Sequence, residues 1–214
     1  MAKKTALIDA DSLIYYEMGK ESLDIAIDGI DSRIAQMLEI TGADSYAGFL
    51  TQGKCFRYGI AKNRPYKGNR KYGDKPIIFP AIKEYLKQKW NCQIVPALEA
   101  DDLVSVYHNK DTVICSPDKD VLYQNVGVHY NYGKGELVTV NHQSAIKFLW
   151  KQVLMGDSTD GIEGIPKIGE KTSDKLLENV EHFEMLIYIL KNEDDVLRET
   201  GVKLLKLVTN PFNR

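Results

Sequence analysis

Short apolar runs alternate with longer amphipathic segments over the first two thirds of the chain. The apolar runs predict strands at 5–10, 45–50, 92–97, 112–116 and 126–132. Between them, helical spacing predicts helices at about 22–40, where Ile27, Ile30, Ile34 and Leu38 share one stripe, at 80–90 and at 100–108. This alternation is typical of βαβ units, and it predicts an α/β fold with a mainly parallel sheet flanked by helices.

Past about residue 142 the pattern becomes helical. Amphipathic runs cover 142–155, a stretch from about Glu170, and the segments 180–190 and 196–208. Without a linker or repeat in the chain, we expect an α/β core over 1–142 and a helical C-terminal part over 143–214, packed as one unit with that core.

The composition excludes several classes of site and segment. The 28 basic and 30 acidic residues nearly cancel, so overall charge predicts no partner. Three widely spaced cysteines and four scattered histidines form no metal-ligand spacing, which disfavours both a disulfide framework and a zinc site. Asp9 and Asp11 interrupt the only apolar run near the start. We therefore expect no signal or membrane segment and a cytoplasmic protein, in the host cytoplasm if a phage encodes it.

Acidic residues recur where predicted strands end or hand over to helices. They are Asp9, Glu99, Asp101, Asp102, Asp118, Asp120, Asp157 and Asp160. Singly, each fits a helix N-terminus or a turn. Together they predict a group of mutually repelling carboxylates at the carboxyl edge of a parallel sheet, where ligands bind. Oxygen ligands without Cys or His suit Mg²⁺ or Mn²⁺, and the number of carboxylates suits two ions.

Basic residues concentrate between Lys54 and Lys75, where Tyr58, Tyr66 and Tyr72 are interleaved among eight Lys and Arg side chains. A solvated basic loop is one interpretation. Clustering with aromatic residues, in a chain that is slightly acidic overall, favours a nucleic-acid contact.

A glycine-rich stretch, GIEGIPKIGEKT, follows the last acids. It predicts a tight hairpin and a helix from about Glu170, with isoleucines anchoring the turn in a core. Gly164 and Gly169 would let the backbone approach a phosphate, and Lys167, Lys171 and Thr172 could add contacts. Such binding is independent of base sequence and sensitive to salt.

In these motifs and in their order, the chain resembles the flap endonuclease/5′→3′ exonuclease family, which includes bacteriophage 5′ nucleases and the 5′-nuclease domain of bacterial DNA polymerase I. The matching segments are LIDADSLIYY, CFR with PYKGNR, EADD, SPDKD and GDSTDGIEGIPKIGEKT, spread over roughly 5–211. The resemblance implies a 5′-nuclease-like (PIN-type) fold with a helix–hairpin–helix that often binds a potassium ion.

The resemblance also implies residue roles. The eight acids named above would hold or support two metal ions, and Lys67 and Arg70 would stabilise the phosphate under attack. Arg57, Tyr66 and the hairpin residues would contact DNA. The expected reaction is in-line attack on a phosphodiester by metal-activated hydroxide, which leaves a 5′-phosphate. The implied partners are DNA with 5′ ends, flaps, nicks or gaps, and RNA–DNA hybrids, bound by a monomer acting in replication or repair.

Three departures from the family pattern leave alternatives open. Thr51 and Gln52 stand where the family has an Asp after the second strand, only KYGDKPIIFP fills the interval of the helical arch, and Lys167 replaces a common hairpin glycine. A DNA-binding protein with weak or no cleavage is therefore an alternative. A haloacid-dehalogenase-type phosphatase with Asp9 as nucleophile is a remote alternative, because it leaves EADD, PYKGNR and the hairpin unexplained.

Overall fold

The computed structural model describes residues 3–61, 64–69, 75–178, 181 and 184–185. These residues fall into two compact units. Unit 1 contains the described residues of Met1–Gly53 and Tyr72–Val140, and unit 2 contains those of Lys54–Lys71 and Asn141–Leu207. The described residues of Lys54–Lys71, which include most of the basic segment, thus fall in unit 2, although the sequence assigned this segment to the α/β core.

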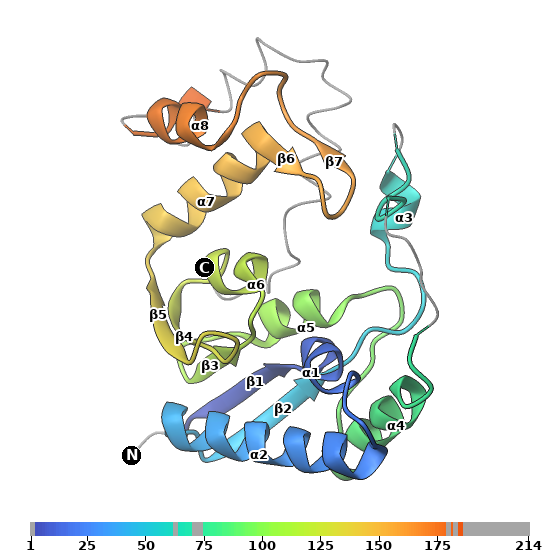
Figure 1. Cartoon of the computed structure of the whole chain (residues 1–214). Coiled ribbons are helices and arrows are strands. Elements are labelled where there is room, and N and C mark those ends of the chain that lie inside the picture. Colours follow the sequence, from blue (N-terminus) through green and yellow to red (C-terminus); the bar gives the residue numbers. More distant parts are fainter. Residues whose placement is uncertain (1–2, 62–63, 70–74, 179–180, 182–183, 186–214) are drawn as a thin grey trace. The chain divides into compact units, whose positions relative to one another are not determined.

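Unit 1 is built on a five-stranded sheet. Its strands are β1 (Thr5–Asp9), β2 (Ser45–Phe49), β3 (Thr112–Cys115), β4 (Gly127–Asn131) and β5 (Glu136–Val140), in the order β2-β1-β3-β4-β5. The first four strands are parallel and β5 is antiparallel to β4. The carboxyl ends of β2, β1 and β3 therefore lie side by side at one edge of the sheet (Figure 1).

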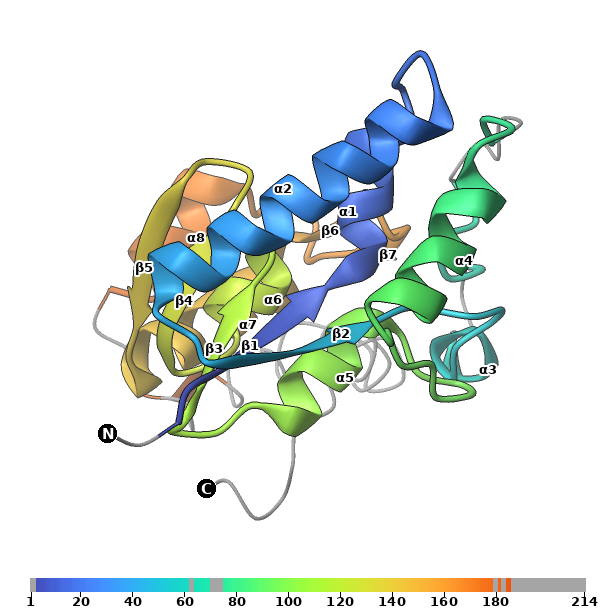
Figure 2. The same ribbon diagram turned by 90° about the horizontal axis from the view of Figure 1, so that it is seen from below.

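Helices cover both faces of this sheet (Figures 1 and 2). They are α1 (Ala10–Glu17), α2 (Leu23–Thr41), α4 (Phe79–Lys89), α5 (Ala100–Tyr107) and α6 (Lys119–Tyr123). Strand alternation divides the core, since Ala6 and Ile8 pack with α1, α2 and α4 while Leu7 packs with α5 and α6. Each buried Leu or Ile side chain contributes roughly 1.5–3 kcal/mol. The predicted α/β class with a mainly parallel sheet is confirmed.

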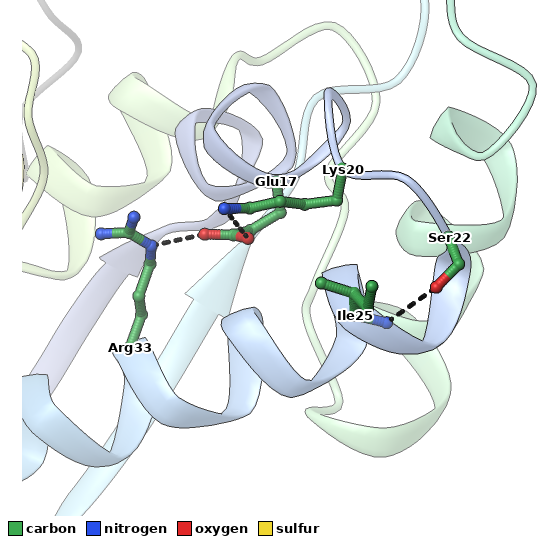
Figure 3. A network of polar contacts seen from close by, with 5 residues as sticks. All are labelled: Glu17, Lys20, Ser22, Ile25 and Arg33. Atoms are coloured by element: carbon green, nitrogen blue, oxygen red, sulfur yellow. Dashed lines mark hydrogen bonds and ion pairs between the residues drawn. The ribbon is translucent and has the colours of Figure 1, made fainter.

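Helices α1 and α2 are also joined by an ion pair in which the carboxylate of Glu17 is buried (Figure 3). Glu17 accepts a hydrogen bond from Arg33 Nε at 2.6 Å, and Lys20 Nζ lies 3.9 Å from its other oxygen. A Cβ at Gly29 would lie 2.3 Å from Glu17 Oε2, so the glycine leaves room for this carboxylate. Ser22 caps α2 by accepting a hydrogen bond from the Ile25 N–H.

One predicted strand is wrong. In the segment 92–97 only Gln93 pairs, in an isolated bridge with Phe49 of β2. Pro96 has no N–H to donate, and Ala97 adopts a left-handed φ of 65°, so a ladder cannot continue. The sequence also missed β5, although its alternating residues follow a glycine-containing turn at 132–135.

Unit 2 has its own core. Its elements are α3 (Arg57–Ile60), α7 (His142–Met155), β6 (Gly156–Asp157), β7 (Ile162–Glu163) and α8 (Glu170–Leu176). Tyr66, Trp150, Leu154 and Ile162 are among the residues buried together there. The helix expected from about Glu170 is confirmed as α8, whereas the helices expected at 180–190 and 196–208 lie almost entirely outside the described residues.

No helix in the described part of the chain combines the length and the apolar character that a membrane crossing needs.

Candidate active site

Asp9 closes β1 and is almost completely buried, at 1% exposure. Its carboxylate caps α1 by accepting hydrogen bonds from the Ser12 N–H at 3.3 Å and the Ser12 hydroxyl at 2.6 Å. The Ser116 hydroxyl, which follows β3, donates to the same carboxylate at 3.0 Å. Two neighbouring strand ends are thus joined through one buried acid.

The pKa of Asp9 is raised from 3.8 to about 6, chiefly by burial and also by the negative charges of Asp11 and Asp118, while the hydrogen bonds from Ser12 and Ser116 act in the opposite direction. Holding this group ionised at neutral pH therefore costs free energy in the metal-free protein. A nearby cation would remove that cost.

The acids after β3 surround the start of α6. Asp118 caps this helix by accepting a hydrogen bond from the Asp120 N–H at 2.7 Å, and its own N–H donates to the Ser116 hydroxyl at 3.1 Å. Ser116 therefore links the Asp118 backbone to the Asp9 carboxylate.

The acids of EADD lie at the start of α5. Glu99 is the N-cap residue, and its N–H donates to Asp102 Oδ2 at 3.3 Å. Asp102 is fully buried, and Asp101 lies beside it in the first turn. Asp102 thus caps the N-terminus of α5, as expected for a single acid at this position, and it is also one of the proposed metal ligands.

Sequence reasoning missed one acid of this group, Asp11. Its Oδ2 accepts a hydrogen bond from the Thr51 N–H at 3.0 Å, just past the end of β2. Burial raises the pKa of Asp11, while hydrogen bonds from Thr51 and the positive charge of Lys83 act in the opposite direction. The signal was its spacing, since Asp11 follows Asp9 by two residues at a strand end.

The donor chemistry of this group fits a hard divalent cation. Its side chains are carboxylates and hydroxyls, and the negative charges of Asp11 and Asp118 each repel that of Asp9. Among the described residues no three His, Cys, Asp or Glu side chains already converge closely enough to hold a metal ion.

The two remaining predicted ligands belong to unit 2, in residues 157–161, here called the acidic loop. Asp157 is the last residue of β6, and Asp160 lies in the turn between β6 and β7. Asp157 Oδ1 accepts hydrogen bonds from the Thr159 N–H at 2.8 Å and the Asp160 N–H at 3.4 Å. The flanking strands pass very close to each other, because a Cβ at Gly156 would lie 2.3 Å from the Gly164 nitrogen. This close approach explains why glycines, Gly156 and Gly164, stand on either side of the acidic loop.

The PYKGNR motif contacts this same loop, about ninety residues later in the sequence. The Tyr66 hydroxyl donates to Asp160 Oδ2 at 2.9 Å, and the Lys67 N–H donates to the Asp160 carbonyl at 2.8 Å. The Asn69 amide donates to the Ser158 carbonyl. Lys67 has a left-handed φ of 56°, so the motif is fixed in a conformation that costs energy for a lysine.

Two predicted DNA contacts do not fit their burial. Tyr66 is 4% exposed, packed edge-on against Tyr58, and its ring is not available for a base to stack on. Arg57 is 2% exposed, with its guanidinium 4.6 Å from the Phe56 ring. Tyr66 instead positions Asp160, because its hydroxyl is bound there. Arg70 lies outside the described residues.

The hairpin residues do lie at the surface of unit 2. Lys167, Gly169, Lys171 and Thr172 are exposed, and Gly164 is half-buried. Ile162 is buried, and Ile165 and Ile168 pack against the same core, as the sequence predicted. Lys167 adopts a left-handed φ of 67°, the conformation for which a glycine would be favoured.

Comparison with solved structures identifies the fold. The bacteriophage T5 D15 protein co-crystallised with metal ions superposes with a TM-score of 0.73 at 18% identity, covering 96% of this chain and 90% of that one. A T5 D15 flap endonuclease complex with DNA and metal ions gives a TM-score of 0.68 at 16% identity, covering 95% and 86%. This chain has the 5′-nuclease fold.

Sequence comparison points the same way. The chain is 30% identical over 153 residues to the 5′-3′ exonuclease of Buchnera aphidicola, which covers 64% of this chain and 53% of that protein. It is 31% identical over 125 residues to the thermostable DNA polymerase I of Thermus aquaticus, covering 49% of this chain and 14% of the polymerase. The resemblance to the flap endonuclease/5′→3′ exonuclease family is confirmed. The chain spans about half, or less, of the length of these curated relatives, and no protein-family model matches it.

Proposed function

We propose that this protein is a structure-specific 5′ nuclease, a 5′→3′ exonuclease or flap endonuclease that hydrolyses DNA phosphodiesters with two divalent metal ions in replication or repair. One observation carries the proposal. Carboxylates gather at the carboxyl ends of neighbouring parallel strands in a chain whose fold matches that of the T5 D15 protein.

The ions proposed are Mg²⁺ or Mn²⁺, held by Asp9, Glu99, Asp101, Asp102, Asp118 and Asp120 from unit 1 and by Asp157 and Asp160 from unit 2. Bound there, they would activate water and offset charge on the reacting phosphate. Two structures of the T5 D15 protein were obtained with metal ions, which supports the assignment by similarity.

The chain's own residues divide the remaining work. The Lys67 ammonium would neutralise phosphate charge, together with Arg70, and the contacts of Tyr66, Lys67 and Asn69 with the acidic loop keep this lysine at a fixed place relative to Asp160. The exposed hairpin would hold the DNA backbone through Lys167, Lys171, Thr172 and peptide N–H groups. A potassium ion bound by hairpin carbonyls belongs to the same proposal.

The substrates proposed are DNA with 5′ ends, flaps, nicks or gaps, and RNA–DNA hybrids, acted on by a monomer. The short interval between the basic motif and α4 argues against threading a long single strand. We therefore expect nicks and short flaps to be cut in preference to long flaps.

The test is cleavage of end-labelled 5′-flap, nicked and single-stranded DNA in Mg²⁺ and in Mn²⁺. Asp118→Ala and Lys67→Ala should each lower the rate by about 100-fold or more. Asp24→Ala and Lys110→Ala, which change exposed residues of unit 1, are matched controls and should cut like the wild type.

Thr51 favours a second candidate, a structure-specific DNA-binding protein without cleavage, because a neutral side chain follows β2 where the family has an Asp. Tight, salt-sensitive junction binding with no cleavage in either metal would support this candidate and overturn the nuclease.

A further inference from the structure

The residues that follow β2, Thr51 and Gln52, carry no charge, but Thr51 takes part in a network of hydrogen bonds. The Thr51 hydroxyl accepts a hydrogen bond from the Ala100 N–H at 2.9 Å, at the start of α5. The Thr51 carbonyl accepts one from Lys83 Nζ of α4. Thr51 therefore ties β2 to the helix that carries EADD, but it brings no charge of its own.

A carboxylate nevertheless reaches this point from another element. Asp11, in the first turn of α1, accepts a hydrogen bond from the Thr51 N–H at 3.0 Å and also bonds the Thr51 side chain. Because the Thr51 hydroxyl accepts from Ala100, its own proton is free to point toward Asp11. Asp11 is thus held against the end of β2 by both the backbone and the side chain of Thr51.

Strand register explains the meeting. Strands β1 and β2 are parallel, with Asp9 opposite Phe49. Asp11 and Thr51 each lie two residues beyond that pair, so the two chain segments leave the sheet side by side. An acid after β1 can therefore take the place of an acid after β2.

Asp11 also lies among the proposed metal ligands. Its charge acts on Asp9, and the charge of Glu99 acts on it, so it bridges the β1 acid and the EADD acids. Lys83 partly balances this charge in the metal-free protein.

We propose that Asp11 supplies to the metal centre the negative charge that the family places on the second strand, with Thr51 fixing the orientation of the Asp11 carboxylate. This inference rests on the proposed function. It explains how an active metal site could persist with Thr51, and it assigns a role to an acid of LIDADSLIYY to which the resemblance gave none.

The test is Mn²⁺ binding to the full chain without DNA, measured by isothermal titration calorimetry and by the electron paramagnetic resonance signal of free Mn²⁺. Asp11→Asn, which keeps the shape and an acceptor oxygen, should weaken Mn²⁺ binding about tenfold or more. The charge-relocating double variant Asp11→Ser/Thr51→Asp should bind within about threefold of the wild type.

Asp24→Asn is the matched control, because Asp24 occupies the same second position of α2 that Asp11 occupies in α1, but is exposed. It should leave Mn²⁺ affinity unchanged. Melting curves in EDTA check folding, and Asp11→Asn should melt no lower than the wild type, because it removes one of several neighbouring like charges.

The outcomes are separable. Wild-type Mn²⁺ affinity in Asp11→Asn, with binding lost in Asp118→Ala, overturns the role of Asp11 and leaves the nuclease proposal intact. Weakened binding in both Asp11→Asn and the double variant also overturns it, because relocated charge would then not suffice. Absence of Mn²⁺ binding by the wild type removes this inference together with the proposed metal mechanism.

Discussion

Asp9 in unit 1 and Asp160 in unit 2 are both proposed metal ligands, but the structure treats them differently. The hydrogen-bond donors to the Asp9 carboxylate are neutral serine groups, and burial together with two neighbouring acids raises its pKa to about 6. Asp160 is bound through its carboxylate by Tyr66 and through its carbonyl by Lys67. In unit 1, repulsion between the buried carboxylates destabilises the metal-free protein, and a bound cation would reduce it. In unit 2, hydrogen bonds from Tyr66 and Lys67 stabilise Asp160 without a cation.

The largest expected effect comes from removing the stored charge. Asp9→Asn should lower cleavage by about 100-fold or more, yet raise the free energy of unfolding in EDTA at pH 8 by about 1–3 kcal/mol. The gain follows because Asn still caps α1 but carries no buried charge. Urea unfolding and flap cleavage measure the two effects. A less stable metal-free variant would contradict the comparison.

A buried histidine in unit 1 should make the stability of the protein depend on pH below neutrality. His129 of β4 is fully buried, its Nε2–H donates to the Asn125 carbonyl, and burial lowers its pKa from 6.5 to about 4. The unfolded chain then binds more protons between pH 6.5 and 4, so stability falls as the pH falls through this window, by about 3 kcal/mol in total.

Urea unfolding at several pH values, run beside His129→Gln, isolates this contribution. The difference between the two proteins should narrow as the pH falls from 6.5 to 4, because only the wild type loses this stability. A difference that is independent of pH would show that His129 is not held neutral.

A smaller effect is expected in unit 2. Tyr66→Phe removes the hydroxyl that donates to Asp160 and should cost about 0.5–1.5 kcal/mol without metal. Cleavage should fall mainly in kcat, since Tyr66 is buried and positions an acid instead of touching DNA. Single-turnover kinetics separate this from a loss of DNA affinity. Tyr58→Phe, on the neighbouring ring, is the matched control.

The smallest effect concerns the hairpin. Lys167→Gly replaces a lysine whose backbone is in the left-handed conformation and should stabilise the protein by up to about 1 kcal/mol. It should also reduce the dependence of log Kd on log salt by about one, because one phosphate contact is lost. Lys147→Ala, an exposed change on α7, should alter neither quantity. An unchanged salt slope in Lys167→Gly would remove Lys167 from the DNA interface.

Much of this architecture follows from local pattern. Apolar runs predicted β1, β2, β3 and β4, and helical spacing predicted α2, α4, α5 and α7, within one or two residues. The acids at the ends of β1 and β3 could be assigned because strand ends are local features, and their common edge follows from parallel pairing. The strand predicted at 92–97 was wrong because the prediction followed the apolar composition. That composition does not reveal that Ala97 has a left-handed backbone, and Pro96 cannot donate a ladder hydrogen bond.

Tertiary structure decided the partners of these residues. Only strand register places Asp11 at Thr51 and makes an acid after one strand available at the end of the next. Only the fold of unit 2 brings PYKGNR onto the acidic loop and buries Tyr66, a ring that sequence alone assigned to DNA. Sequence determined which chemistry is present, because residue type and local spacing fix charge and element. The structure determined which groups meet, because contacts between distant segments depend on pairing and packing that no local pattern encodes.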